Sequence, residues 1–126
     1  MSTNALAWPT ELRLKTGRRV LTVTWDDGSS DELTAELLRV RSPSAEVKGH
    51  TPAERKTVGG KREVSISAIE PVGNYAVRLV FDDGHSTGLY TFRYLAELGR
   101  DRETVWEAYL GELEEKGLSR DRPGQR

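Results

Sequence analysis

The sequence feature that most constrains the fold is an aromatic-Asp-Asp-Gly turn, which occurs twice. Trp25–Gly28 follows the β-branched run Val20–Trp25, and Phe81–Gly84 follows the similar run Tyr75–Phe81. Glycine adopts positive φ without a Cβ penalty, and aspartate hydrogen-bonds the backbone of a tight turn. Each motif therefore predicts a hairpin in which the chain reverses and returns as a second strand.

The two hairpin regions also resemble each other over a longer stretch. Val23–Ser30 and Leu79–Ser86 align without a gap, and Leu33 then matches Leu89. One interpretation is an internal duplication of a hairpin–helix unit. The other is coincidence, because an aromatic residue followed by Asp-Asp-Gly is ordinary turn chemistry. The sequence leaves both interpretations open.

Alternating apolar and polar residues predict strands, and 3.6-residue spacing predicts helices. The expected strands are Glu11–Lys15, Val20–Trp25, Ser29–Leu33, Val64–Ile69, Tyr75–Phe81 and His85–Tyr90. Helical turns are expected at Ala35–Arg39 and at Phe92–Leu98, which Gly99 should close, and a longer helix should follow the N-cap Asp101. The resulting prediction is an α+β fold. Its mainly antiparallel sheet is built from two hairpin–helix units, with the C-terminal helices packed on it.

The length and the polarity of the C-terminus predict one domain with a short tail. A chain of 126 residues is long enough to bury a core without disulfides or metals. We expect residues 1–118 to form this domain and residues 119–126 to form a flexible polar tail. Deletion of Ser119–Arg126 is then expected to change stability by less than ~0.5 kcal/mol.

Composition and charge exclude several classes of function. The chain has no cysteine, which rules out disulfides, thiolate metal sites and cysteine nucleophiles. Its net charge of −1 gives no bulk attraction to nucleic acid or to an anionic membrane. The N-terminus lacks the pattern of a signal peptide, and no apolar run is long enough to span a bilayer. We therefore expect a cytoplasmic protein that binds neither nucleic acid nor membrane.

The sequence carries no recognisable catalytic machinery. It lacks the Gly-x-Ser-x-Gly elbow, the P-loop, the Gly-x-Gly-x-x-Gly motif and His-Glu-x-x-His. His50 and His85 could converge near Glu46, Asp82 or Asp83 to bind a metal or move protons. The simpler interpretation is that both histidines are loop residues hydrogen-bonded to backbone. The irregular region Arg41–Gly60 is rich in Lys and Arg, so a third hypothesis is that it binds an acidic ligand.

Longer motifs make the chain resemble a known family. They are Trp25–Gly28, Leu38–His50, Ile69–Val77 and Phe81–Tyr90. With these stretches the chain resembles the DUF971 family, also called gamma-butyrobetaine hydroxylase-like N-terminal domains, over roughly Pro9–Leu98. In gamma-butyrobetaine hydroxylase, the domain precedes an iron- and 2-oxoglutarate-dependent oxygenase domain, and we expect no such domain here. A similar domain also occurs fused to P-loop ATPases that carry iron–sulfur clusters.

The resemblance further implies a zinc site in the hydroxylase, held by Cys-x-Cys-x-x-Cys and one distant histidine. The matching positions here are Ser42, Ser44, Val47 and His85. Only the histidine is retained, and a structural zinc needs four ligands. We therefore expect no bound zinc and no other cofactor, with zinc or iron as the alternative.

These observations predict a non-catalytic binding or accessory module. Its expected partner is a protein, such as an iron–sulfur carrier or a metalloenzyme. The alternative is a metal-binding protein or small metal-dependent enzyme that uses His50 and His85. We expect the Ser42–His50 loop to lie against His85 and form the interaction site. The candidate binding residues are Ser42, Ser44, Glu46, His50, Asp83 and His85.

Overall fold

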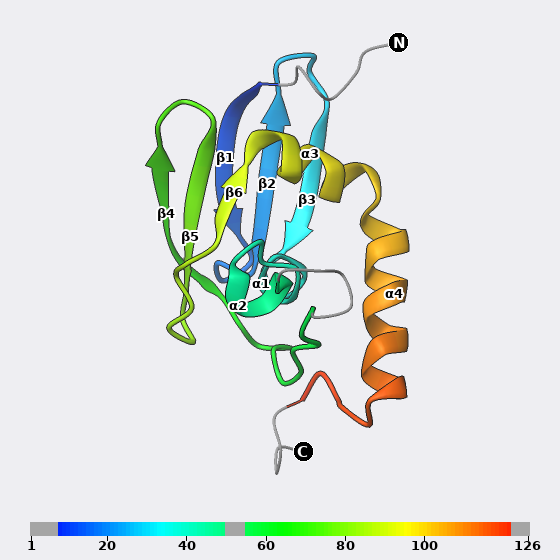
Figure 1. Cartoon of the computed structure of the whole chain (residues 1–126). Helices are drawn as coiled ribbons and strands as arrows, with labels where there is room; N and C mark the ends of the chain where they lie inside the picture. The colour runs from blue at the N-terminus through cyan, green and yellow to red at the C-terminus, as the bar shows by residue number, and fades with distance from the viewer. Residues whose placement is uncertain (1–7, 50–54, 122–126) are drawn as a thin grey trace.

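The computed structural model describes residues 8–49 and 55–121. Within them the chain runs through two β-β-β-α series, with one short helix between the series and one long helix after them (Figure 1). In chain order the elements are β1 (Pro9–Lys15), β2 (Val20–Trp25), β3 (Ser30–Thr34), α1 (Ala35–Val40), α2 (Ala45–Lys48), β4 (Ile66–Val72), β5 (Ala76–Phe81), β6 (Leu89–Thr91), α3 (Phe92–Arg100) and α4 (Arg102–Glu115). The short helix α2 lies inside the region that was expected to be irregular.

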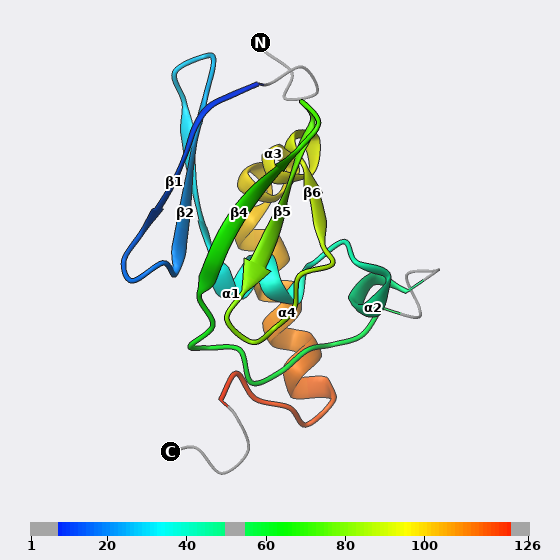
Figure 2. The same ribbon diagram turned by 90° about the vertical axis from the view of Figure 1, so that its left-hand side faces the viewer.

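The strands form two antiparallel three-stranded sheets, β1-β2-β3 and β4-β5-β6. Figure 2 shows the two sheets side on, with the helices beside them. The predicted α+β class is confirmed, but the strands make two sheets where one was expected. The sheets meet where the Ile66 amide donates to the Arg18 carbonyl at 2.8 Å and Arg18 Nε donates to the Ile66 carbonyl at 2.9 Å. These contacts join β4 to the β1–β2 turn without making a continuous ladder.

The two hairpin–helix units repeat in local detail. Gly28 and Gly84 have φ of 90° and 92°, so each Asp-Asp-Gly turn needs a residue that tolerates the left-handed region. Thr34 and Thr91 cap α1 and α3, and each side chain accepts a hydrogen bond from the amide three residues later. The predicted repeat of a hairpin followed by a helix is therefore present in the fold.

One hydrophobic core joins both sheets. The central strands β2 and β5 bury alternate side chains, as period-two strands with one inward face do. These inward residues are Leu21, Val23 and Trp25 from β2, and Val77, Leu79 and Phe81 from β5. Helices α1 and α3 cover the same core with Leu37, Leu38, Leu95 and Leu98. The C-terminal helices thus pack where the sequence predicted.

Helix α3 does not end where the sequence suggested. It continues through Gly99 to Arg100, so the prediction that Gly99 closes the helix is wrong. A Cβ at Gly99 would overlap the Asp31 carboxylate, which accepts a hydrogen bond from Trp25 Nε1 at 2.8 Å. Glycine is therefore needed here for close packing of α3 on β3, and the helix ends later.

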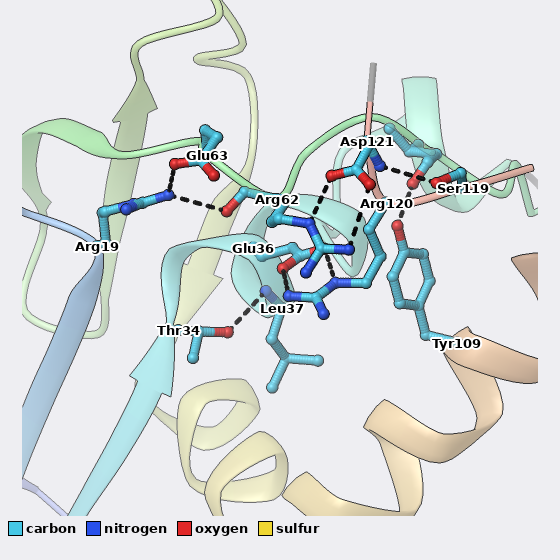
Figure 3. Close-up of polar contacts among 11 residues, drawn as sticks. Arg19, Thr34, Glu36, Leu37, Arg62, Glu63, Tyr109, Ser119, Arg120 and Asp121 are labelled. Atoms are coloured by element: carbon cyan, nitrogen blue, oxygen red, sulfur yellow. Dashed lines mark hydrogen bonds and ion pairs between the residues drawn. The ribbon is translucent and has the colours of Figure 1, made fainter. Parts of the chain in front are cut away.

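The segment after α4 is held on the domain, contrary to the expectation of a free tail from Ser119. The Ser119 carbonyl accepts from the Gly60 amide at 2.8 Å, and the Arg120 carbonyl accepts from the Arg62 amide at 3.0 Å. Arg120 also forms two hydrogen bonds to the buried carboxylate of Glu36, at 2.7 and 2.9 Å (Figure 3). Residues 122–126 of the expected tail lie outside the described residues.

Replacement of Arg120 by alanine is expected to destabilise the fold by about 1–3 kcal/mol, because it leaves the Glu36 carboxylate buried without its partner. The Glu36 side chain is only 6% exposed. Urea denaturation measures the loss. Arg100→Ala is the matched control, since it removes an arginine from an exposed pair and should leave the midpoint nearly unchanged. Equal midpoints for both variants would contradict the structural role of Arg120.

Candidate functional site

The second hairpin differs from the first just after its turn. The Phe81 amide donates to the His85 carbonyl at 2.9 Å, and the His85 amide donates to Asp83 Oδ1 at 3.0 Å. These bonds fix His85 at the end of the turn. The chain then leaves the sheet, and β6 begins only at Leu89. The expected return strand His85–Tyr90 is therefore shorter and later than predicted, and its first residues face another part of the chain.

That other part is the segment between α1 and α2. Ser42 Oγ lies 2.9 Å from His85 Nε2, and both side chains are buried. Ser44 Oγ lies 2.8 Å from Thr87 Oγ1, so a second hydroxyl pair joins the same two segments. The predicted proximity of this loop and His85 is confirmed. We call Ser42, Ser44, His85 and Thr87 the serine–histidine junction.

Local hydrogen bonds position the two serines. Ser42 Oγ accepts from the Ser44 amide at 3.2 Å, and Ser44 Oγ accepts from the Glu46 amide at 3.2 Å as the N-cap of α2. Gly88 lets the segment before β6 approach the segment after α1 closely, because a Cβ there would lie 2.5 Å from Ser42 Oγ. The junction is thus tightly packed on both sides.

A cluster of three charges supports the junction. Asp83 Oδ2 accepts from Arg39 Nε at 2.7 Å and from Lys61 Nζ at 2.5 Å. Partial burial disfavours the ionised carboxylate. Hydrogen bonds from Lys61, the His85 amide and Arg39 outweigh that effect and bring the pKa of Asp83 to about 2. Asp83 is therefore a fixed anion that holds the turn against α1 and the segment before β4.

The surroundings of His85 favour its neutral form. Burial is the main cause that lowers its pKa, and the positive charge of Arg39 lowers it further. Its Nδ1 lies 3.5 Å from Glu46 Oε1. The direction of the bond between Ser42 Oγ and His85 Nε2 depends on which ring nitrogen carries the proton.

Ser42, His85 and Glu46 follow the order of a nucleophile, a base and an acid, but the packing does not suit acyl transfer. Ser42 Oγ already accepts from the Ser44 amide, is hydrogen-bonded to His85 Nε2 and abuts Gly88. Its side chain is buried, so a substrate carbonyl has no approach to the oxygen. These hydrogen bonds instead hold the segment between α1 and α2 against the segment between β5 and β6.

The same residues do not fit a structural zinc. Two of the four positions implied by the family resemblance carry hydroxyls, and Val47 offers no donor atom. His85 Nε2 is committed to Ser42. In residues 8–49 and 55–121, no three His, Asp or Glu side chains gather in a way that would hold a metal ion.

A pocket of about 460 Å³ opens beside the junction. One wall is formed by Arg41–Pro43, Lys48 and Arg55, and the other by Leu89 in β6 and the start of α3. Ser42 belongs both to this wall and to the junction. We call this cavity the basic pocket, after the arginine and lysine side chains around it.

The structure brings five of the six predicted site residues together. Ser42, Ser44 and His85 bond as described, Asp83 holds the turn, and Glu46 approaches the imidazole with its side chain largely exposed. His50 lies outside the described residues. Sequence analysis missed Arg39, Lys61, Thr87 and Gly88 as members of this region. The His-Ser-Thr-Gly sequence after the turn was the available signal, since glycine there marks a close approach.

A family model supports the assignment of this fold. The model of the gamma-butyrobetaine hydroxylase-like N-terminal family matches residues 12–96, more than half of the chain. The chain belongs to this family. The match covers nearly all of both sheets and the serine–histidine junction, whereas α4 and the segment held by Glu36 lie beyond it.

Solved structures resemble this family member along most of its length. Two NMR solution structures are 42% and 44% identical, each with a TM-score of 0.79. They cover 95% and 100% of this chain and 94% and 98% of theirs. A crystal structure of a protein of unknown function in the DUF971 family, from Acidithiobacillus ferrooxidans, is 43% identical with a TM-score of 0.61. That match covers 72% of this chain and 91% of the other. No curated protein matches. Among the helices placed by the structure, none has the length and apolar character to cross a bilayer.

Acidification is expected to weaken the fold through His85. Because its pKa is lowered on folding, this stabilisation is complete above the ordinary value of 6.5 and is lost as the pH falls below it. Thermal melting at about pH 7.5 and about pH 5.5 measures the difference. His85→Gln should reduce the drop in Tm between the two pH values. An unchanged drop in the His85 variant would show that other groups cause it.

Metal removal is expected to leave the fold unchanged, because the zinc-equivalent positions lack three of four ligands. Purified protein should melt at the same temperature with and without a chelator. Elemental analysis should find far less than one zinc per chain. A lower Tm in the chelator, or one tightly held zinc, would overturn this prediction.

Proposed function

We propose that this family member is a non-catalytic binding module that recognises a protein partner at the basic pocket. The observation that carries the proposal is that Ser42 belongs both to the serine–histidine junction and to the lining of the basic pocket. Its side chain is fixed by His85 inside the domain. A binding surface gains from such pre-organisation, because fewer groups must be ordered when the partner binds.

The geometry favours binding over chemistry. The hydroxyl of Ser42 and the imidazole of His85 are both used in the junction, so neither is presented to the pocket as a nucleophile or a base. What the pocket does present is mainly basic side chains beside apolar surface. Such a surface can orient a charged partner but supplies no group that forms or breaks a bond.

The partner that we propose is an iron–sulfur carrier or a metalloenzyme. Support comes from the resemblance stated above, in which similar domains occur beside an oxygenase domain or are fused to cluster-carrying ATPases. In those proteins the domain accompanies metal chemistry that another domain performs. The alternative of a metal site built from His50 and His85 gains no support from the described residues, because His85 Nε2 bonds to Ser42.

Affinity capture tests this proposal. The immobilised chain should retain an iron-containing protein from a lysate of the source organism, and the identified partner should rebind after separate purification. Arg93→Glu, at the basic pocket, should abolish rebinding. Arg13→Glu changes the charge equally on exposed β1 and should leave rebinding intact. Equal rebinding by both variants would place the interface elsewhere, and a purified partner without iron would refute the partner class.

A further inference from the structure

The basic pocket carries an excess of positive charge. Four of its lining side chains are basic, namely Arg41, Lys48, Arg55 and Arg93, and one, Glu97, is acidic. Glu112 neutralises a further charge from outside the lining. Two positive charges remain uncompensated by these carboxylates. A concave surface with such a surplus concentrates anions more strongly than a flat one.

Two of the pocket arginines already bind a carboxylate. Arg41 forms two hydrogen bonds to Glu112, at 2.9 and 3.3 Å, and Arg55 approaches the same group at 2.6 Å. Partial burial opposes ionisation of Glu112, but the hydrogen bonds and charges of the two arginines lower its pKa overall. The Tyr94 hydroxyl fixes the backbone of Arg41 by donating to its carbonyl. This wall therefore already holds one carboxylate within the chain.

The opposite wall has one cationic side chain, Arg93. Arg93 is exposed in the first turn of α3 and pairs with no carboxylate in the part of the chain that the structure places. The other three helices have a glutamate in the first turn, where the helix dipole favours negative charge. In α3 an arginine occupies this region beside the pocket. An external anion would form an ion pair with Arg93 and would also interact favourably with the positive end of the α3 dipole.

Apolar surface lies next to these charges. Leu89 is 37% exposed in β6, and Pro43 lies on the facing wall. A pocket of about 460 Å³ is of the size that holds small ligands or a few side chains. Among the lining residues that the structure describes, Tyr94 is the only aromatic one, and its ring is partly buried, so little aromatic surface is offered on which a nucleic-acid base could stack.

We infer that the basic pocket binds a short acidic segment of the partner protein, through one carboxylate at Arg93 and Lys48 and one apolar side chain against Leu89 and Pro43. This inference rests on the proposed function and adds the chemistry of the partner. The carboxylate is the group that the pocket arginines already hold within the chain. The apolar contact distinguishes a peptide from a free dicarboxylate, which has no side chain to place there.

NMR titration of the isotope-labelled chain tests the inference with synthetic peptides. The probe is acetyl-Glu-Glu-Leu-Glu-Glu-amide. Two comparison peptides replace its glutamates by glutamine or its leucine by serine, and succinate serves as the small dicarboxylate. The first peptide should shift the resonances of Leu89, Arg93 and Lys48, and its binding should weaken as salt rises from about 50 to about 300 mM. The glutamine and serine peptides and succinate should all bind more weakly.

Variants identify the residues responsible. Arg93→Glu should raise the Kd for the probe peptide about tenfold or more, as expected for loss of a charge-assisted contact. Arg13→Glu, with the same change of net charge, should stay within about twofold. No shifts at the pocket, or equal binding by the glutamine peptide, would overturn the acidic-segment inference. Succinate binding as tightly as the peptide would assign the site to a small dicarboxylate instead. If the peptide tests fail but the chain still captures an iron-containing protein, the proposed function holds and only the acidic-segment inference is wrong.

Discussion

The shared core in which β2 and β5 bury their inward faces is the constraint on which the rest of the structure depends. Each sheet has only three strands and needs a second layer to bury its apolar face. Trp25 and Phe81 end the two central strands inside this shared core, so the two Asp-Asp-Gly turns are fixed by the same packing. The residues that follow each turn are therefore held in a defined position. For the second turn, this places His85 beside the segment that follows α1.

The candidate site arises from a difference between two otherwise equivalent hairpins. After the first turn the chain pairs again at once, from Ser30. After the second it stays out of the ladder until Leu89, and the freed residues bond to the segment that follows α1. A repeated unit thus supplies the scaffold, while the departure from the repeat supplies polar groups with no role in the sheet. Such departures are where function is usually found.

The sequence predicted what local chemistry controls. The alternation in Val20–Trp25 and the two Asp-Asp-Gly turns were sufficient for the hairpins, and the family resemblance placed Ser42 near His85. It did not reveal the ion pair between Glu36 and Arg120, which joins residues 84 positions apart. A polar C-terminal segment has the same composition whether it is solvated or docked. The predicted end of α3 at Gly99 was wrong for a similar reason. Glycine is favoured both at a helix end and at a close contact such as the one with Asp31, and the sequence does not distinguish the two.

The junction also has a consequence for how firmly the pocket is held. Hydrogen bonds between neutral groups, such as Ser42 with His85 and Ser44 with Thr87, each contribute about 1 kcal/mol, whereas a structural metal contributes far more. The wall formed by Arg41–Pro43 therefore depends on weak bonds together with the stronger Arg41–Glu112 pair. Local opening of this segment should require less free energy than unfolding of the core. A ligand bridging Lys48 and Arg93 would hold both walls together, so binding at the pocket and order in the junction are energetically coupled.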